Sequence, residues 1–479
     1  MSVFDQFAFE AGVVARSLGD YWRGGALRLG VTGLSRAGKT VFVTSLVNNL
    51  IANARLPVFA VSAEGRLAGA RLEPQPDDAV PRFPYEEHLA ALSGPGRHWP
   101  QSTNRISQLR LRLDFARAGG WNAGPAHLDL DIVDYPGEWL LDLTLLDKTF
   151  TQWADETIAA SRAPGRAGLA GAWLAHLDGL DPAAPFDEDA ARAAATLFTD
   201  YLRAARADAF ALSTLPPGRF LMPGDLEGSP ALTFSPLTVE DGKIAPGSLA
   251  AMMRRRYDSY RTHIVKPFFR DHFSRLDRQI VLVDALGALN SGPAALRDLE
   301  NAMTQVMRAF RAGRGSKFAS IFRPRVDRIL FAATKADHLH HENHDRLENV
   351  LRALTARVIA RAEGVGAQID VIALAAVRAT REARLREGGE EFEAIVGTPE
   401  LGERIGDQVF DGVAEAAVFP GRLPDDPMTL FDGEGLALAE ADNDLRFVKF
   451  RPPLWPRGSA PPQIRLDRAL QFLLGDRLA

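Results

Sequence analysis

The sequence predicts an α/β protein with a doubly wound, mostly parallel sheet, a large helical insertion and a C-terminal α+β extension. Three observations predict this fold class. A glycine-rich turn at residues 33–40 lies between a strand-like and a helix-like stretch. Apolar runs of strand length recur at 279–285, 326–333 and 368–374, with helical stretches between them, which is typical of buried parallel strands. Residues 147–278 have helical periodicity instead.

Composition limits the class of protein. The chain has 479 residues, with 46% hydrophobic and 24% charged residues, as in ordinary globular proteins. A net charge of −5 argues against a generally basic nucleic-acid binder, so no nucleic-acid partner is expected. Without cysteine, disulfides and thiolate zinc sites are excluded. No stretch approaches the roughly 20 apolar residues of a membrane span, and the start lacks the order of a signal peptide. We therefore expect a cytoplasmic protein.

Residues 1–25 begin the chain with apolar side chains spaced three or four apart, which predicts an N-terminal amphipathic helix. Two interpretations stay open for this helix. It docks on the body of the protein, or it lies in a membrane interface. Few basic residues flank it, which favours docking.

Residues 33–40 match the GxxxxGK[ST] phosphate loop. The glycines let backbone N–H groups point at phosphate oxygens, Lys39 reaches the β and γ phosphates, and Thr40 offers a hydroxyl to Mg²⁺. A strand with alternating apolar residues from Leu27 precedes the loop and a helix is predicted after it. The predicted nucleotide-binding residues of this segment are Gly33, Leu34, Ser35, Arg36, Ala37, Gly38, Lys39, Thr40 and Val41.

A proline- and glycine-rich stretch from 56 to 100, with a short helix predicted at 85–92, leads to Trp99-Pro100-Gln101-Ser102-Thr103. A connection this long is functional or mobile. Thr103 or Ser102 would supply a second hydroxyl to Mg²⁺ from a loop that closes over the nucleotide. A plain turn threonine is the alternative.

Two alternating strands follow, at 109–115 and 128–132. Antiparallel pairing would bring Arg110 and Arg112 onto the aspartates of the second strand. That strand ends in the DxxG pattern Asp134-Tyr135-Pro136-Gly137. In a phosphate-hydrolysing site, this aspartate holds Mg²⁺ through water and the glycine N–H bonds the γ phosphate.

The strand at 326–333 ends in Thr334-Lys335-Ala336-Asp337. A carboxylate here accepts two hydrogen bonds from the N1–H and amine of guanine, a donor pair that adenine lacks. Lys335 lays its stem along the base, and the loop at Ala376 and Val377 packs against it. Four histidines follow between 338 and 344; a solvated helix start is favoured over a metal site.

The insertion includes a long basic helix, predicted over 248–275, with seven Arg and Lys side chains. A solvated face is favoured over a binding site for an acidic partner such as lipid headgroups. Peripheral contact with the inner membrane face, or with a membrane protein, therefore stays a hypothesis. The last hundred residues are less regular, with a strand-like stretch at 445–450 and a helix at 466–474.

With these segments placed, the chain resembles the YcjX-like family of bacterial P-loop GTPases over essentially its full length. The resemblance rests on GLSRAGKT, WPQST, DYPGEW and TKAD. It implies a GTPase-type P-loop fold, GTP and GDP as ligands, and a link to envelope or phage-shock stress. The family's nucleotide residues correspond here to Gly33, Gly38, Lys39, Thr40, Thr103, Asp134, Gly137, Lys335 and Asp337.

Three residues set this chain apart from GTPases at large. Thr334 replaces the usual asparagine, which would loosen the base loop, and Glu138 stands where many small GTPases carry a water-orienting glutamine. The phosphate loop is similar to that of guanylate-binding proteins, where the arginine at the position of Arg36 acts as an internal finger. We hypothesise that Arg36 acts on the γ phosphate in a nucleotide-dependent homodimer.

We therefore expect an N-terminal helix (1–25), a GTPase domain in two halves (26–146 and 279–382), a helical insertion (147–278) and a covering subdomain (383–479). The expected activity is Mg²⁺-dependent hydrolysis of GTP to GDP by a slow switch. Arg36, Lys39 and Thr103 are the predicted catalytic residues, and Thr40, Thr103 and Asp134 the metal ligands. The alternative is a scaffold that nucleotide only stabilises, with little turnover.

Overall fold

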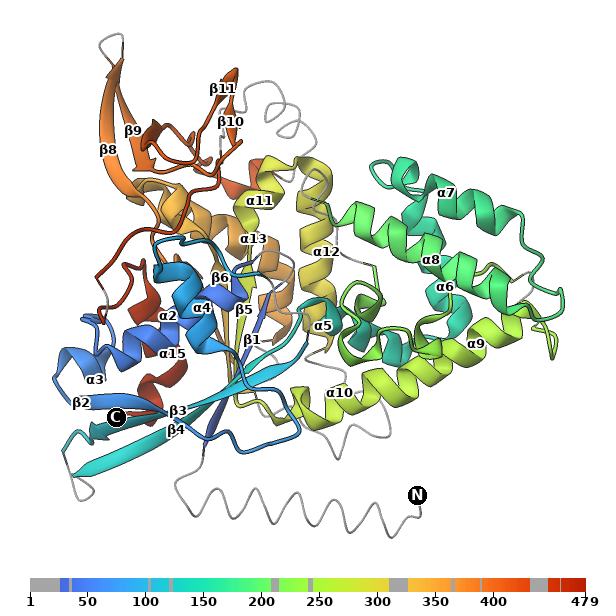
Figure 1. Cartoon of the computed structure of the whole chain (residues 1–479), viewed down its shortest axis with the longest axis horizontal. Helices are drawn as coiled ribbons and strands as arrows, with labels where there is room; N and C mark the ends of the chain where they lie inside the picture. Colours follow the sequence, from blue (N-terminus) through green and yellow to red (C-terminus); the bar gives the residue numbers. More distant parts are fainter. Residues whose placement is uncertain are drawn as a thin grey trace.

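A computed structural model describes residues 26–33, 37–101, 105–119, 124–207, 215–239, 244–309, 326–362, 367–387, 390–430, 447–456 and 458–479. The predicted N-terminal helix lies outside this part of the chain. A sheet with helices on both faces occupies one side of the molecule in Figure 1, and a bundle of helices projects from it on the other.

The central sheet has seven strands in the order β2-β3-β4-β1-β5-β6-β7. Strands β1, β4, β5, β6 and β7 pair in parallel, whereas β2 and β3 join antiparallel. The strand bounds are β1 (Leu27–Gly33), β2 (Leu67–Glu73), β3 (Ser107–Ala116), β4 (Pro125–Asp134), β5 (Arg278–Val283), β6 (Arg328–Ala333) and β7 (Gln368–Ala373). The prediction of a mostly parallel α/β sheet is confirmed.

Alternate residues of the parallel strands enter two separate cores. In β5, Ile280 and Leu282 face the core beneath α2 (Lys39–Ile51) and α15 (Leu466–Leu474), together with α3 (Ala60–Ala63). Val281 and Val283 face the opposite core, beneath α11 (Ala285–Asn290), α12 (Pro293–Ala309) and α13 (His344–Ala362). Burial on both faces explains why these strands read as continuous apolar runs.

The antiparallel pair β3–β4 confirms the predicted charge ladder. Arg110 lies opposite Asp131 and Arg112 opposite Asp129 in the register. Each arginine makes a two-bond fork to its aspartate, with distances of 2.6 to 2.8 Å. The ladder fixes the register of β4 against β3.

The stretch from 56 to 100 contains the predicted helix, α4 (Tyr85–Ser93), and also an edge strand, β2, which the sequence did not reveal. Gly69 and Ala70 break the apolar alternation there, and only Leu67 of β2 is buried. An edge strand with one buried residue carries almost no period-two signal.

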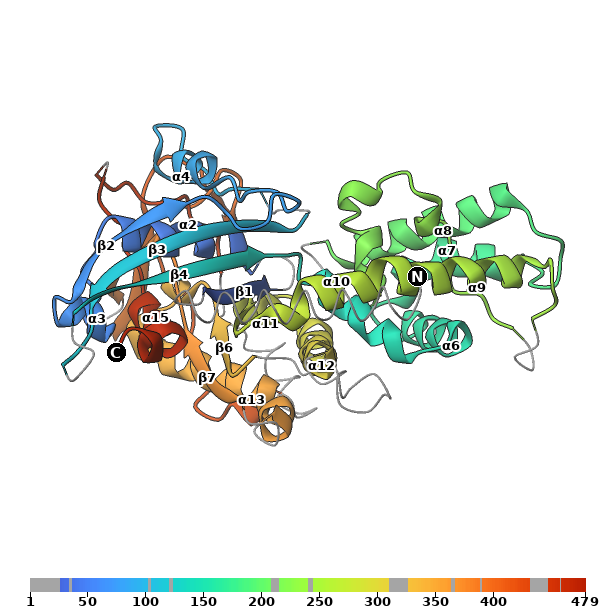
Figure 2. The same cartoon turned by 90° about the horizontal axis from the view of Figure 1, so that it is seen from below.

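The insertion contains α6 (Phe150–Ser161), α7 (Ala167–Asp178), α8 (Glu188–Ala205), α9 (Leu249–Tyr260) and α10 (Lys266–Asp271). Aromatic rings fill its interior: Trp153 stacks on Tyr257, and Trp173 stacks on Tyr201. The predicted single helix over 248–275 is wrong in two respects: a π-helical segment over Arg261–Val265 joins α9 to α10, and after Asp271 a separate 3-10 helix covers Phe273–Arg275. Pro267 explains the break, because it has no N–H to continue the ladder. Figure 2 shows the insertion extending from the end of the sheet.

The C-terminal part forms a three-stranded sheet of β8 (Arg381–Glu387), β9 (Glu390–Gly397) and β12 (Ala416–Val418), and a hairpin of β10 (Arg404–Ile405) and β11 (Gln408–Val409). The predicted strand at 445–450 is wrong for its described residues, which make only an isolated bridge between Phe450 and Pro399. The predicted last helix is confirmed as α15. It packs on the central sheet, in the same core as α2.

Candidate nucleotide-binding site

The carboxyl ends of the parallel strands bring the predicted motifs to one edge of the sheet. Gly33 of β1 pairs with Leu282 of β5, and Val31 pairs with Asp134 at the end of β4. Val283 pairs with Ala333, the residue before Thr334. In open α/β sheets, ligands bind at this edge.

The two ends of the predicted phosphate loop, Gly33 and Gly38, lie in the described part of the chain. Gly38 lies in the left-handed region, with φ of 77°, and caps the start of α2. A Cβ at Gly33 would lie 2.8 Å from the carbonyl oxygen of Leu282, so this position requires glycine. Lys39 is buried and its Nζ donates to the Gly33 carbonyl at 3.1 Å. The lysine therefore lies across the loop, where phosphate oxygens would compete for its ammonium group.

Of the other residues predicted to bind phosphate or metal, some lie in the described part of the chain and the rest lie outside it. Ala37, Thr40 and Asp134 are buried and Val41 is half-buried, with Thr40 and Val41 in the first turn of α2. The predicted residues outside the described part of the chain are Leu34, Ser35, Arg36 and Thr103, together with Ser102. Asp134 is the last residue of β4, and buried Gly137 leads into α5 (Glu138–Asp142).

The base loop is held firmly. Thr334 donates through both its N–H, at 2.9 Å, and its hydroxyl, at 3.3 Å, to the carbonyl of Val283. These two bonds anchor Thr334 to the end of β5; the expected loosening of the base loop stays a prediction. Asp337 is 4% exposed and its Oδ2 accepts from the Ala379 N–H at 2.8 Å. One hydrogen bond fixes the carboxylate, which has further acceptor sites for a ligand.

Asp284, which the sequence prediction did not include, contacts the predicted base loop. Lys335 has a positive φ of 61° and its ammonium group forms an ion pair with the Asp284 carboxylate. Asp284 also caps α11 by accepting from the Gly287 N–H at 2.9 Å. Asp284 directly follows β5 in the sequence, so its place at the same edge of the sheet could have been predicted.

The loop after β7 lies against the phosphate-loop helix. Ser45 of α2 donates to the carbonyl of Ala376, and Val377 is buried. Ala375 exchanges two backbone hydrogen bonds with Ile464, of 3.1 and 2.8 Å. These contacts hold the loop after β7 against α2 and against the segment that leads into α15.

The segment after Gly137 is buried in the helical insertion. Glu138 is 2% exposed, and Nη2 of Arg206, just beyond α8, lies 2.9 Å from its Oε1. The Arg219 guanidinium lies 3.2 Å above the Trp139 ring. The acid at the position of the usual glutamine is therefore held by the insertion, a contact that no local pattern reveals.

Asp142, at the end of α5, joins the same interface. Its carboxylate accepts from the Gly218 N–H and from the Tyr260 hydroxyl, both at 2.6 Å. Burial away from water raises the pKa of Asp142 to about 6, because the lost hydration of the charged form outweighs these two donors.

The basic helix is largely neutralised by its own surroundings. Arg256 pairs with Glu188, Arg261 with Asp258, and Arg270 with Asp271. Arg254 and Arg255 are exposed. Among the described helices, none is both long and apolar enough to cross a membrane.

Comparison with known proteins places the chain. Residues 27–478 match the YcjX-like family, DUF463. A protein of Escherichia coli (strain K12), named Ras-like GTPase YcjX, is 38% identical over 467 residues, covering 94% of this chain and 96% of that protein. A protein of the same name from Shewanella oneidensis is 33% identical over 481 residues, covering 94% of each. The chain therefore belongs to the YcjX-like family.

Proposed function

We propose that the chain binds GTP and Mg²⁺ and hydrolyses GTP slowly to GDP and phosphate, as a molecular switch. The observation that carries the proposal is the convergence of Lys39, Asp134 and Asp337 at one edge of the sheet. The names of the two relatives support the same activity.

Guanine selection is assigned to Asp337. Its carboxylate is buried and is fixed by the Ala379 N–H. A guanine base would donate two hydrogen bonds to it, whereas an adenine would leave it facing a mismatched edge. Leaving a buried charged acceptor unsatisfied costs on the order of 2 kcal/mol or more. Ala376 and Val377 would support the base from the neighbouring loop.

Magnesium is assigned to Thr40, Thr103 and Asp134. A hydroxyl and a carboxylate are oxygen donors, which Mg²⁺ prefers, and Thr40 and Asp134 are both buried at the carboxyl edge. When bound, Mg²⁺ neutralises charge on the phosphates. Lys39 would stabilise the same charge, and the N–H of Gly137 would bond a γ-phosphate oxygen. Water attacks the γ phosphorus and the bond to the β–γ bridging oxygen breaks, which releases GDP and phosphate.

Arg36 is assigned the role of an internal arginine finger that engages in a homodimer. Arginine fingers contribute roughly 10³ to 10⁵ in rate. Single-turnover phosphate release, measured for wild type and Arg36→Ala over a range of protein concentrations, tests this. We expect wild-type rates to rise with concentration and variant rates to stay low. Equal rates at matched GTP occupancy would exclude the role.

A second candidate function is a scaffold that nucleotide stabilises with little turnover. Glu138 favours it, because the side chain at the position of the usual glutamine is paired with Arg206 rather than aimed at a nucleotide. Water would then lack an orienting group.

Competition of GTP, GDP and ATP for a fluorescent guanine nucleotide, followed by phosphate release with and without Mg²⁺, tests both candidates. The switch predicts guanine selectivity and slow Mg²⁺-dependent release. Selective binding without release would favour the scaffold. Equal competition by ATP and GTP would contradict the assignment of guanine selection to Asp337.

A further inference from the structure

A cluster of nitrogen and oxygen donors lies just beyond the predicted base loop. His340, His341 and Glu342 each offer one donor atom, and these three atoms lie within 4.8 Å of one another. His340 caps the short helix η9 (His341–Asn343), which contains His341 and Glu342, and the cluster begins three residues after Asp337. They precede α13, which packs beneath the central sheet.

A fourth donor comes from the C-terminal sheet. Glu382, in β8, places Oε2 2.8 Å from His341 Nδ1 and 4.0 Å from His340 Nε2. The cluster therefore joins two segments about 40 residues apart in sequence. Local helix geometry alone does not produce this arrangement.

The buried histidine of the cluster has an unsatisfied nitrogen. His340 is 3% exposed, and its Nδ1 has no hydrogen-bond partner among the described residues. A buried polar atom without a partner costs roughly 1–3 kcal/mol. A cation bound at Nδ1 would supply the missing partner, because neutral imidazole is a common metal ligand; the other ring nitrogen, Nε2, is the one that lies 4.0 Å from Glu382 Oε2.

Two arginines and one acid lie beside the two glutamates: Arg378 and Arg384 approach them, and Glu393 shares a side-chain hydrogen bond with Glu342. Arg378 bonds Glu382 through Oε1, at 3.1 Å, so Oε2 is the oxygen that faces the histidines. Arg384 lies 3.7 Å from Glu342 Oε1, which is longer than a hydrogen bond. His341 is 59% exposed, so an ion could reach the cluster from solvent.

We propose that His340, His341, Glu342 and Glu382 bind one divalent transition-metal ion of the zinc class. Two imidazoles with carboxylates suit zinc and its neighbours better than Mg²⁺, which prefers oxygen alone. Ligands of a tetrahedral zinc ion stand about 3.3 Å apart, given Zn–N bonds of about 2.0 Å. The donors of His340, His341 and Glu342 must therefore close by about 1.5 Å at most, and His341 Nδ1 and Glu382 Oε2 must separate by about 0.5 Å. Rotation of the exposed His341 and Glu342 side chains supplies these movements.

The ion would fasten the segment that carries Asp337 to β8. Asp337 already bonds the Ala379 N–H, and Thr380 donates to the Asp337 carbonyl. A metal bridge a few residues farther along would stiffen this connection. A second expectation, which rests on the proposed function, is that bound metal slows the dissociation of guanine nucleotide.

The test uses the full-length chain without a histidine tag, stripped of metal with a chelator and titrated with Zn²⁺ in excess Mg²⁺. Isothermal titration and metal analysis of the gel-filtered protein should show one Zn²⁺ per chain. His341→Ala and Glu382→Gln should each weaken binding by about 10-fold or more. Co²⁺ in place of Zn²⁺ should give the absorption bands of a four- or five-coordinate site with nitrogen ligands.

The matched control is His127→Ala, which removes another exposed histidine and should leave the Zn²⁺ stoichiometry unchanged. Thermal unfolding without metal shows whether each variant is folded. Wild-type Zn²⁺ affinity in both His341→Ala and Glu382→Gln, or no bound Zn²⁺ in the wild type, would overturn the proposal. Neither result depends on GTP binding, so failure here leaves the proposed GTPase function in place. Nucleotide dissociation with and without Zn²⁺ is then measured separately.

Discussion

At the scale of single residues, ion pairing and burial shift the pKa values of two aspartates in opposite directions. Asp129 pairs with Arg112 on the sheet surface, and the guanidinium lowers the pKa of this carboxyl below its usual range. Burial raises the pKa of Asp142 to about 6, because the loss of hydration outweighs its hydrogen bonds and the nearby Arg219 charge. The stability that Asp129 contributes is therefore lost as pH falls, whereas the stability that Asp142 contributes is lost as pH rises.

Asp142 predicts a specific dependence of stability on pH. Between the unfolded pKa of 3.8 and the folded value of about 6, the folded chain holds a proton that the unfolded chain has lost. The free energy of unfolding contributed by Asp142 should therefore fall as pH rises through this window, by about 3 kcal/mol at most. Asp142→Asn cannot titrate and should lack this fall; its amide keeps one oxygen acceptor for the Gly218 N–H, and its NH₂ group replaces the oxygen that accepts from the Tyr260 hydroxyl.

Urea unfolding at steps from pH 4 to pH 7 measures the effect as the difference between wild type and Asp142→Asn. The difference should change over the window and level off above it. Parallel curves for the two proteins would show that Asp142 titrates normally.

At the scale of elements, α5 connects the nucleotide edge to the helical insertion. Gly137 begins the turn into α5, Glu138 meets Arg206, and Asp142 meets the insertion's η2 helix (Gly218–Phe220). Tyr135 and Trp139 pack edge-on against Phe268 of α10. If Gly137 shifted on loss of the γ phosphate, α5 would therefore change its contacts with the insertion.

Close backbone packing at this junction requires Gly218. A Cβ at Gly218 would overlap the carbonyl of Glu138, so Gly218→Ala should push the insertion loop from α5 and destabilise the fold by about 1–3 kcal/mol. Gly171→Ala is the matched control: this glycine lies within α7, with nothing within 4 Å of an added Cβ.

Chemical denaturation compares the two variants. Gly171→Ala should stabilise by about 0.5–1 kcal/mol, because alanine suits a helix interior better than glycine does. Equal stability of Gly218→Ala and wild type would mean that the loop has room to move away at no cost.

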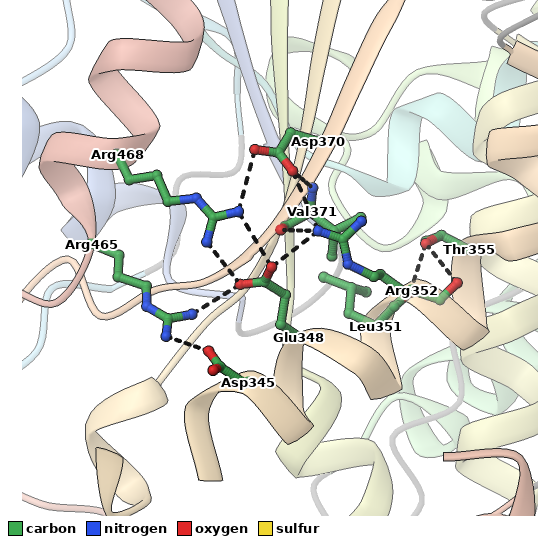
Figure 3. Close-up of polar contacts among 9 residues, drawn as sticks. All are labelled: Asp345, Glu348, Leu351, Arg352, Thr355, Asp370, Val371, Arg465 and Arg468. Atoms are coloured by element: carbon green, nitrogen blue, oxygen red, sulfur yellow. Dashed lines mark hydrogen bonds and ion pairs between the residues drawn. The ribbon is translucent and has the colours of Figure 1, made fainter. Parts of the chain in front are cut away.

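At the scale of the whole molecule, the last helix fastens the end of the chain to the first core. Glu348 of α13 accepts from Arg465 and Arg468 at 2.9 and 3.1 Å, as Figure 3 shows. Asp370 of β7 lies 3.5 Å from Arg468. At the other end of α15, buried Arg278 bonds Asp476 at 2.7 Å. Charged contacts therefore hold both ends of α15 on the sheet.

Glu348→Gln should weaken this attachment, because the arginines lose a carboxylate that is 11% exposed. We expect a loss of about 1–3 kcal/mol in the free energy of unfolding. Asp345→Asn is the control: its carboxylate also bonds Arg465 but is 84% exposed, so about 1 kcal/mol or less should be lost. Urea unfolding checks both, and equal losses would show that burial of Glu348 does not matter.

Local patterns in the sequence predicted much of the fold and only part of the site. The buried parallel strands, the charge ladder and α15 leave periodic signals that their own residues carry. The pairs Lys335–Asp284 and Arg206–Glu138 join residues far apart in the chain, so one strand or helix cannot reveal them. β2 was missed because an edge strand needs little apolar surface.

The most direct measurement is nucleotide selectivity of wild type and Asp337→Asn, determined by competition with GTP, ATP and XTP. Xanthine carries a carbonyl where guanine carries its amine, so an asparagine amide N–H complements it and the aspartate does not. Wild type should prefer GTP by about 10²-fold or more over both competitors, and Asp337→Asn should prefer XTP over GTP. A wild type that binds GTP and ATP equally, or a variant with unchanged selectivity, would contradict guanine recognition by Asp337.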